Sequence, residues 1–312
     1  MNKPLVSVII VSYNTRDYTT KAMRLALDSK GFKERQVEVI LIDNNSPDDS
    51  VSYTKKHLPN VKVIANKENR GFGGGNNQGA DIAKGKYLLF LNPDAFLAPD
   101  SLKVMFDIME KNEEIVSVGP QLHFENGDLQ QSAGYLPTPL RVTAWMWWLD
   151  KIPFIKTLFK EPYHVFDLDW HKKDHYPDWL MGACIMFRKD EFMAVGGFDD
   201  KIFMYAEEVE LYRRLLDPDM QKGLPRRRRV FFTTATHVVH AGSVSTKRAG
   251  AYRLALELQG IEYIYKKHYQ HLLWYIQFVI NIGVIIRMIL FNILPKRRDT
   301  LVEYKKYWNR TK

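Results

Sequence analysis

The stretch LLFLNPDAFL, residues 88–97, runs from a continuous apolar segment directly into a carboxylate at Asp94. A short apolar run of this kind is typical of a strand that is buried on both faces of a sheet. Four similar runs lie within the first 120 residues: LVSVIIV at 5–11, VEVILI at 37–42, VKVIA at 61–65 and IVSVG at 115–119. Helical patterns separate them, so we expect an α/β fold with a mostly parallel sheet and helices on both of its faces.

Polar residues follow several of these strands. In a parallel sheet the ligand site lies beyond the carboxyl ends of the strands, which places Tyr13, Asn14, Asp43, residues 66–75 and residues 92–94 on one rim. Divalent cations such as Mg²⁺ take carboxylate oxygens together with substrate phosphates, so Asp94 fits a metal that also binds a nucleotide diphosphate. The alternative is a turn or capping acid after a proline.

The stretch NRGFGGGNNQG, residues 69–79, is rich in glycine and precedes a helical pattern. Closely spaced glycines let a backbone approach an anionic ligand. Gly73, Gly75 and Gly79 match the dinucleotide fingerprint loosely, but that loop follows the first strand of its fold and this one follows the third. A dinucleotide-dependent oxidoreductase is therefore disfavoured, and a flexible connection stays as the alternative.

Two further acidic sites stand out. Asp43 could accept hydrogen bonds from a base or a ribose, or it could be a loop acid before a helix that we expect to start with Ser46 as N-cap and Pro47 after it. In FMYAEEVELYRRLL, residues 203–216, Glu207 and Glu210 share one helix face while Glu208 points about 100° away. One of these acids could face the crevice, and a solvated acidic face is the alternative.

The composition is that of a globular protein, with 312 residues of which 46% are hydrophobic and 26% charged. One cysteine, Cys184, cannot form an internal disulfide, which favours a reducing compartment. The first apolar run is short and β-branched, unlike a signal peptide, so we do not expect export. The net charge of +9 favours acidic partners. The basic run RRRR at 226–229 is more typical of a solvated or headgroup-facing segment than of a nucleic-acid site, so no nucleic-acid partner is expected.

Residues 272–294 form a 23-residue segment without an acid, long enough to cross about 30 Å of hydrocarbon. Gln277, Asn281 and Asn292 share a narrow polar face, and Arg287 lies off it. Both flanks are basic. A helix lying in the cytoplasmic interface suits both flanks, while a spanning or re-entrant segment and a core or oligomer helix remain alternatives.

The motifs occur in a recognisable order. They are VSVIIVSYN, LIDNNSPDDS, NRGFGGGNNQGA, LFLNPDA, MGACIMFRK, GGFDDKIFMYAEEVEL and VVHAGSVS. This set resembles inverting family 2 glycosyltransferases of the GT-A fold, and most closely bacterial rhamnosyltransferases of cell-wall and surface-polysaccharide synthesis. The resemblance covers roughly residues 4–248 and implies a catalytic domain 1–248, with a nucleotide-sugar-binding half 1–120 and an acceptor-binding half 121–248. Residues 249–312 would form a helical, basic, membrane-associating region.

The resemblance also implies roles for single residues. A Mg²⁺ or Mn²⁺ ion would bind Asp94 and His240, whereas His237, three residues earlier on the strand, is expected to be structural. Glu208 would be the general base, although the family usually has aspartate there, and Ala206 stands where glycine is common. Gly182 and Glu207 would contact the acceptor. The nucleotide-sugar contacts would be Ser12, Tyr13, Asn14, Asp43, Asn69, Arg70, Gly71 and Asn92.

The implied activity is transfer of a sugar, with inversion, to a hydroxyl of a polyprenyl-diphosphate-linked glycan. By resemblance the donor is dTDP-rhamnose, and UDP-linked sugars remain open. The enzyme is expected on the inner face of the cell membrane, attached peripherally, and a homo-oligomer is left open. A non-catalytic nucleotide-sugar-binding scaffold is the alternative from another class, and retained acids at Asp94 and Glu208 disfavour it.

Overall fold

The computed structural model describes residues 3–156, 159–219, 221, 227–242, 253–293 and 298–310. The chain divides into two compact units. The sheet unit contains residues 1–133, 166–203 and 207–244, and the helical unit contains residues 134–165, 204–206 and 245–312. The domain boundary expected at 248 and the SVS of the last motif lie outside the described residues, so that division stays a prediction.

The sheet unit contains most of the strands and seven helices among its described residues. Its strands are β1 (Val6–Ser12), β2 (Val37–Asp43), β3 (Lys62–Ala65), β4 (Tyr87–Leu91), β5 (Ala95–Leu97), β6 (Ile115–His123), β7 (Leu129–Gln130), β9 (Trp179–Leu180), β10 (Cys184–Arg188) and β11 (Arg229–His240), with β8 (Ala133–Gly134) at its boundary. Its helices are α1 (Arg16–Leu27), α2 (Ser50–His57), α3 (Gly71–Ile82), α4 (Ser101–Lys111), η2 (Trp170–Lys172), α7 (Lys189–Ala194) and α8 (Glu207–Leu215).

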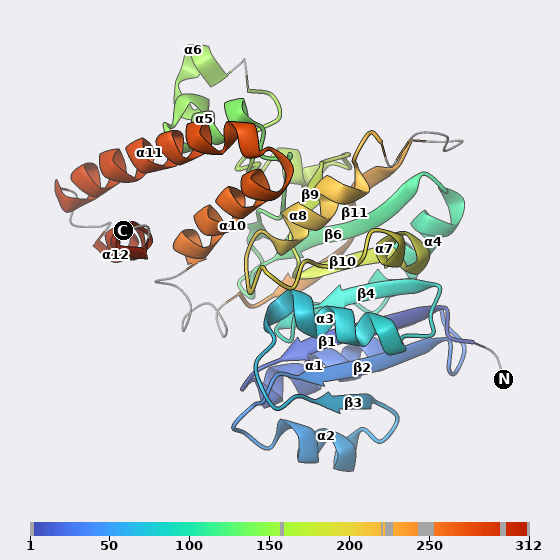
Figure 1. The fold of residues 1–312 in the computed structure, drawn as a ribbon. Helices are drawn as coiled ribbons and strands as arrows, with labels where there is room; N and C mark the ends of the chain where they lie inside the picture. The colour runs from blue at the N-terminus through green and yellow to red at the C-terminus, as the bar shows by residue number, and fades with distance from the viewer. Residues whose placement is uncertain are drawn as a thin grey trace. The chain divides into compact units, whose positions relative to one another are not determined.

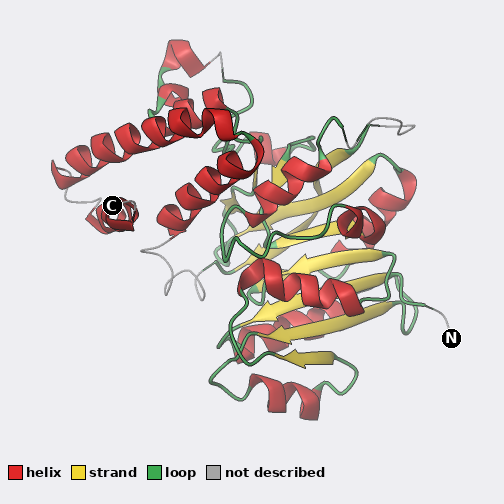
Figure 2. Ribbon diagram, viewed as in Figure 1, coloured by secondary structure: helices red, strands yellow, loops and turns green. Residues whose placement is uncertain are grey.

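The main sheet has the strand order β3-β2-β1-β4-β10-β6-β11-β5, with β7 paired to β6 (Figures 1 and 2). Strands β3, β2, β1 and β4 are parallel, as expected from their apolar runs. Beyond them the sheet is mixed, because β10 is antiparallel to both β4 and β6 and β5 is antiparallel to β11. The α/β class is confirmed, and the parallel part is the half that carries the rim residues.

Alternation along β1 explains why helices cover both faces of the sheet. Val8 and Ile10 belong to one buried cluster with Ala22 and Met23 of α1. Because neighbouring side chains of a strand point to opposite faces, Ile9 and Val11 face the other way, toward α3. A strand that is buried on both faces therefore has a continuous run of apolar residues in its sequence.

Most of the glycine-rich stretch is the first part of α3 and not a loop. The approach of its glycines to an anionic ligand stays a prediction. Gly75 and Gly79 are four residues apart and face β1. A Cβ atom at Gly75 would lie 2.9 Å from Cγ1 of Val11, and one at Gly79 would overlap Ile9. These glycines allow the helix to lie close on the sheet.

The start of α2 also differs from the expectation. The helix begins at Ser50 with Asp49 in the N-cap position, four residues after Ser46. The Ser46 hydroxyl instead accepts a hydrogen bond from the Asn14 backbone N–H at 2.9 Å. A contact between two loops thus replaces the local cap that the sequence pattern favours.

The helical unit has its own set of helices. They are α5 (Pro139–Met146), η1 (Leu149–Lys151), α6 (Pro153–Lys156), α10 (Arg253–His268), η3 (Gln270–Leu272), α11 (Leu273–Ile293) and α12 (Arg298–Arg310). Helix α11 contacts α5, α10 and α12 and buries Ile276, Val279, Ile280 and Val284.

Arg287 fixes one face of α11 inside this unit. Its side chain is buried and donates hydrogen bonds to the backbone oxygens of Trp145, at 2.7 Å, and Met146. The guanidinium carbon also lies 4.4 Å from the centre of the Trp148 ring. Burial lowers the pKa of Arg287, and these carbonyl and ring contacts replace the water that its charge has lost.

Substituting Gly79→Ala should destabilise the protein by roughly 1–3 kcal/mol, because the new methyl overpacks the contact with Ile9. Gly74→Ala is the matched control in the same helix, where the nearest atoms to a new Cβ are Arg70 Cβ at 3.3 Å and Asp200 Oδ1 at 3.7 Å. Urea denaturation of both variants measures the difference. Equal unfolding free energies for the two variants would contradict close α3–β1 packing.

Candidate active site

Asp43 lies at the end of β2, beside Ser12 at the end of β1 in the parallel register. The Asp43 side chain is 2% exposed, and its Oδ2 accepts a hydrogen bond from the Ser46 N–H at 2.9 Å. Its Oδ1 is buried and has no hydrogen-bond partner among the described residues. Because an unmade hydrogen bond at a buried acceptor is costly, this oxygen is suited to accept one from a ligand.

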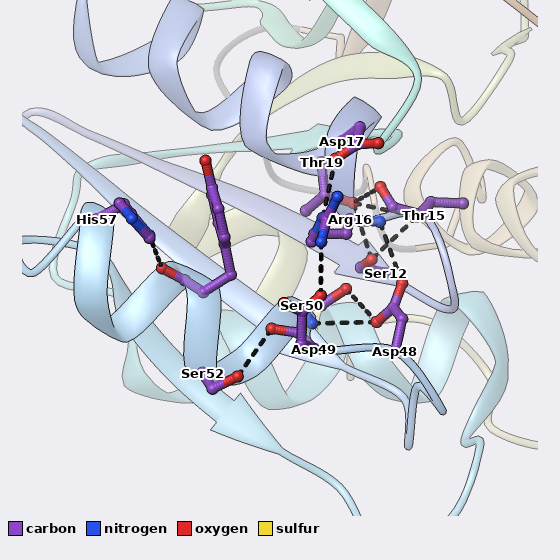
Figure 3. A network of polar contacts seen from close by, with 11 residues as sticks. Ser12, Thr15, Arg16, Asp17, Thr19, Asp48, Asp49, Ser50, Ser52 and His57 are labelled. Atoms are coloured by element: carbon purple, nitrogen blue, oxygen red, sulfur yellow. Dashed lines mark hydrogen bonds and ion pairs between the residues drawn. The ribbon is translucent and has the colours of Figure 1, made fainter.

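The turn after β1 is built by a network of polar contacts that Figure 3 shows. The Ser12 hydroxyl bonds to those of Thr15 and Thr19, at 3.0 and 2.8 Å, so the network occupies this side chain. Arg16 forms an ion pair with Asp49 at 2.9 Å, which ties the turn to the start of α2.

Tyr13 and Asn14, the two residues after Ser12, differ in backbone conformation and exposure. Asn14 has a φ of 55°, in the left-handed region that asparagine tolerates better than most residues. Tyr13 is 50% exposed and is free to stack on a flat ligand.

Asn44 joins the ends of β2 and β3 to the start of α3. Its Nδ2 donates to Asn69 Oδ1 at 3.2 Å and to the Gly71 carbonyl at 3.0 Å, and its Oδ1 accepts from Asn66 Nδ2 at 3.0 Å. Sequence reasoning missed this residue, although it directly follows Asp43 in the LIDNNS motif. Asn69 and Gly71 are thus placed by a side chain from the neighbouring strand end, while Arg70 between them is exposed.

Gly71 connects this rim to a distant segment. Its φ is +71°, and a Cβ atom there would overlap the Phe203 carbonyl oxygen, which accepts a hydrogen bond from the Phe72 N–H at 3.1 Å. Asn77 of α3 also bonds the backbone of Phe198 in both directions at 2.9 Å. Helix α3 therefore holds residues 198–203, which lead toward the acids of α8.

Asn92, Asp94 and His240 meet where β11 pairs with β5. Asp94 and His240 are 3% and 7% exposed. His240 Nε2 lies 3.4 Å from Asp94 Oδ1 and 3.4 Å from Asn92 Nδ2. The Ala241 N–H donates to the Asp94 carbonyl at 3.0 Å, which fixes the relative position of the two segments. His237 is exposed, and its ring packs edge-on against His123.

Gln130 of β7, a second residue that sequence reasoning missed, orients His240. Its Oε1 lies 3.0 Å from His240 Nδ1. A carbonyl oxygen only accepts, so His240 Nδ1 donates to Gln130 and Nε2 is the ring nitrogen directed at Asp94. A histidine that binds a metal commonly donates its other ring N–H to a carbonyl or carboxylate oxygen, as Nδ1 does here. Asp94 and His240 therefore fit a divalent cation.

The described residues contain no group of three or more His, Cys, Asp or Glu that could hold a metal ion. A cation at Asp94 and His240 would therefore take its remaining ligands from substrate oxygens or water, as Mg²⁺ and Mn²⁺ commonly do in nucleotide sites.

The acids at the start of α8 have different surroundings. Glu210 is fully buried and its Oε2 pairs with Arg214 Nη2 at 2.6 Å. Glu207 is 5% exposed, whereas Glu208 is partly exposed. Burial, with a smaller contribution from the Glu208 carboxylate, raises the pKa of Tyr212 one turn further along. Gly182 lies against the Phe72 ring of α3. A Cβ atom added at Gly182 would be 3.0 Å from Phe72 Cζ.

The model of the family described as "Glycosyl transferase family 2" matches residues 7–173. The chain belongs to glycosyl transferase family 2. One relative is the N-acetylglucosaminyl-diphospho-decaprenol L-rhamnosyltransferase of Mycobacterium tuberculosis, 27% identical over 198 residues, which are 58% of this chain and 62% of that protein. Another is the succinoglycan biosynthesis protein ExoO of Rhizobium meliloti, 31% identical over 127 residues, which are 40% of this chain and 34% of that protein.

Two solved structures share the fold of this family 2 member. The S. aureus protein TarS has a TM-score of 0.52 at 16% identity over 83% of this chain and 64% of that one. GalNAc-T7 with UDP, GalNAc and Mn²⁺ has a TM-score of 0.54 at 18% identity over 84% and 48% of the two chains. The GT-A fold expected from the motifs is confirmed.

Glu210→Gln should destabilise the protein by about 3 kcal/mol, because it removes the charge of a fully buried carboxylate from its partly buried partner Arg214. Glu208→Gln is the matched control on the same helix and should change the unfolding free energy by no more than about 0.5 kcal/mol. Thermal and urea unfolding measure both. A large destabilisation by Glu208→Gln would show that this acid, too, is part of the core.

Proposed function

We propose that this glycosyltransferase moves rhamnose from dTDP-rhamnose to a hydroxyl of a polyprenyl-diphosphate-linked glycan, with inversion at the anomeric carbon. The observation that supports the chemistry best is the convergence of Asn92, Asp94 and His240 at the carboxyl-end rim of the sheet, where His240 Nε2 and Asp94 Oδ1 face each other at 3.4 Å. The name of the M. tuberculosis relative supports the choice of sugar and acceptor class.

In this mechanism Glu208 is the general base. It removes a proton from the acceptor hydroxyl, the hydroxyl oxygen attacks the anomeric carbon, and the bond from that carbon to the diphosphate oxygen breaks. Attack comes from the face opposite the nucleotide, so configuration inverts in a single displacement and no covalent enzyme intermediate forms. Glu207 and Gly182 would contact the acceptor.

The donor would be held along the rim. Asp43 Oδ1 would accept a hydrogen bond from the base or ribose, and Tyr13 would stack on the base. Asn14 and the Asn69–Gly71 turn would line the nucleotide, Ser12 would support the turn, and Asn92 would lie near the ribose. Asp94 and His240 would hold Mn²⁺ or Mg²⁺, which when bound neutralises charge on the departing diphosphate.

A UDP-linked sugar is the alternative donor, since none of the contacts proposed above distinguishes thymine from uracil. A nucleotide-sugar-binding scaffold without activity is the alternative from another class. It is less consistent with two acids, Asp94 and Glu208, at the positions that the chemistry requires.

We further propose that the helical unit attaches the enzyme to an anionic membrane surface. Within the part of the chain that the structure describes, one helix, Gln270–Ile293, is long and apolar enough by length and composition to cross a membrane. Its face opposite the buried one carries Trp274, Phe278, Ile289 and Ile293, which are 69%, 52%, 59% and 71% exposed.

An in-plane position suits α11 better than a spanning one. Arg287 and four apolar residues bind one face to the rest of the helical unit, so only the opposite face is left for lipid. Asn281 is largely covered, and Gln277 and Asn292 lie at the border of the apolar face.

Charge distribution supports an anionic partner for this unit. The helical unit contains 17 of the 45 Lys and Arg but only six of the 36 Asp and Glu, so its formal charge is +11 and that of the sheet unit is −2. By contrast, Arg228 and Arg229 of the basic run in the sheet unit are engaged with Glu191 and the Tyr176 ring. Arg226 and residues 294–297 lie outside the described residues.

A donor panel tests the chemistry. Purified enzyme with Mn²⁺ or Mg²⁺, several nucleotide sugars and a synthetic lipid-linked acceptor should give a product only with dTDP-rhamnose, as measured by mass spectrometry. Asp94→Ala should abolish turnover, and Glu208→Gln should lower it by roughly 10²–10⁴-fold. Transfer from a UDP-sugar alone would replace the donor, and full activity of Glu208→Gln would contradict the assigned base.

Liposome flotation tests the membrane proposal. The variant Trp274→Ser/Phe278→Ser/Ile289→Ser should lower partition onto anionic vesicles by about tenfold or more, because three apolar side chains no longer enter the interface. Met193→Ser, which changes an exposed apolar residue of the sheet unit, is the control and should bind like the wild type. Unchanged binding of the triple variant would exclude this face as the contact.

A further inference from the structure

We propose that helix α10 positions the catalytic acids of α8, and that Gly260 is the residue through which it does so. This inference rests on the proposed role of Glu208 as the base. It gives the C-terminal helices a part in catalysis that is separate from membrane attachment.

The first observation is where the residues before the acids belong. Met204, Tyr205 and Ala206 are part of the helical unit, although the chain on both sides of them is part of the sheet unit. Helix α8 begins directly after them, at Glu207. The three residues, called the link below, are therefore covalently continuous with the first turn of the helix that carries Glu208 but pack with the helical unit.

The second observation is the backbone of this link. Tyr205 and Ala206 have φ angles of 69° and 71°. L-residues other than glycine rarely adopt such angles, and two in succession persist only where surrounding contacts hold them. Contacts with other segments of the chain must therefore hold the backbone of Tyr205 and Ala206 in this conformation.

The third observation is the contact that holds it. A Cβ atom on Gly260 would lie 2.6 Å from Ala206 Cβ and 3.0 Å from the Tyr205 carbonyl oxygen. Only glycine at position 260 lets α10 come this close, and Ala206 is 5% exposed beneath it. The Arg253 guanidinium lies 6.0 Å from the centre of the Tyr205 ring, at the start of the same helix.

Helix α10 is itself firmly placed within the helical unit. Glu257 accepts hydrogen bonds from His164 Nε2 at 2.6 Å and from the Tyr163 hydroxyl at 3.2 Å. Burial opposes the charge of Glu257, but the nearby His164 more than offsets it, so the pKa of this carboxyl is lowered. The Tyr265 hydroxyl donates to the Pro137 carbonyl at 2.5 Å. Gly260 lies between these two anchors, so α10 can act as a rigid support.

This geometry makes the position of Glu208 depend on Gly260. A methyl group at 260 would push the link away and rotate the first turn of α8. A displacement of about 1 Å at a reacting group can lower turnover by about 10²-fold. Asp43 and Asp94 follow strands of the sheet unit, whereas Gly260 packs on Tyr205 and Ala206, so donor binding should be spared.

The test compares the wild type with Gly260→Ala, the double variant Gly260→Ala/Ala206→Gly, and Gln259→Ala as a neighbouring control on α10. Gly260→Ala should lower kcat at least 30-fold, with KM for the donor and Kd for the nucleotide changed less than threefold. The double variant removes the methyl that collides and should recover turnover to within about fivefold of the wild type. Gln259→Ala should behave like the wild type.

Hydrogen–deuterium exchange provides a readout that does not depend on the donor or on activity. The backbone amides of residues 205–208 should exchange at least tenfold faster in Gly260→Ala and return toward the wild-type rate in the double variant. If no donor supports transfer by the wild type, the proposed function fails while this measurement still tests the contact. Unchanged exchange in Gly260→Ala, or a loss of activity that Ala206→Gly does not recover, would overturn the inference.

If Gly260→Ala does not fold, Ala206→Val adds bulk to the same contact from the other side. It should accelerate exchange at 205–208 and lower kcat in the same way. Wild-type exchange and turnover in that variant would contradict the positioning role.

Discussion

The close approach of α3 to β1 is the constraint on which the rest of the sheet unit depends. Gly75 and Gly79 allow the helix to lie directly on Val11 and Ile9, which fixes the height of its first turn above the rim. Asn69–Gly71 lie at the start of this helix and accept hydrogen bonds from the side chain of Asn44, which directly follows β2. The same helix bonds Phe198 and Phe203, so the nucleotide rim and the segment leading to α8 share one support.

Much of the sheet could be predicted because a strand buried on both faces has few acceptable residues. The runs at 5–11, 37–42 and 86–91 contain little except β-branched and large apolar side chains, and all three became parallel strands. The start of α2 could not be predicted in the same way, because Ser46 satisfies the cap rule locally but bonds the Asn14 N–H in the fold. The packing role of Gly75 and Gly79 could not be predicted for a related reason, since a spacing of four residues suits helix packing as well as it suits a phosphate loop.

In the candidate site, too, the roles that depend on contacts between distant segments could not be predicted from the sequence. Asp43, Asp94 and Glu208 are recognisable because each carboxylate follows a strand or begins a helix in a motif. Gln130 and Gly260 carry no such signal: one is a polar residue of a two-residue strand, and the other is a glycine 54 positions after the Ala206 that it touches. Their roles depend on which distant segments the fold brings together. The residues proposed to carry the chemistry could be predicted from the sequence, whereas the residues that contact and place them could be found only in the structure.

The two units differ in formal charge. The sheet unit has a formal charge of −2 and contains the buried oxygens and the imidazole of the candidate site, while the helical unit, at +11, carries all of the net positive charge. If the helical unit binds an anionic bilayer as proposed, an acceptor anchored in that bilayer would meet the candidate site at the same surface. Residues 204–206, of which Tyr205 and Ala206 have positive φ angles, pack with the helical unit and directly precede the helix of the proposed base.

The most direct test of this account is the anomeric configuration of the product, measured by NMR coupling constants on sugar transferred from a donor of known anomeric configuration. A single displacement with Glu208 as base predicts that the product has the opposite configuration at the anomeric carbon. Retained configuration would require a different arrangement of groups at the reacting carbon and would contradict the mechanism proposed for these residues.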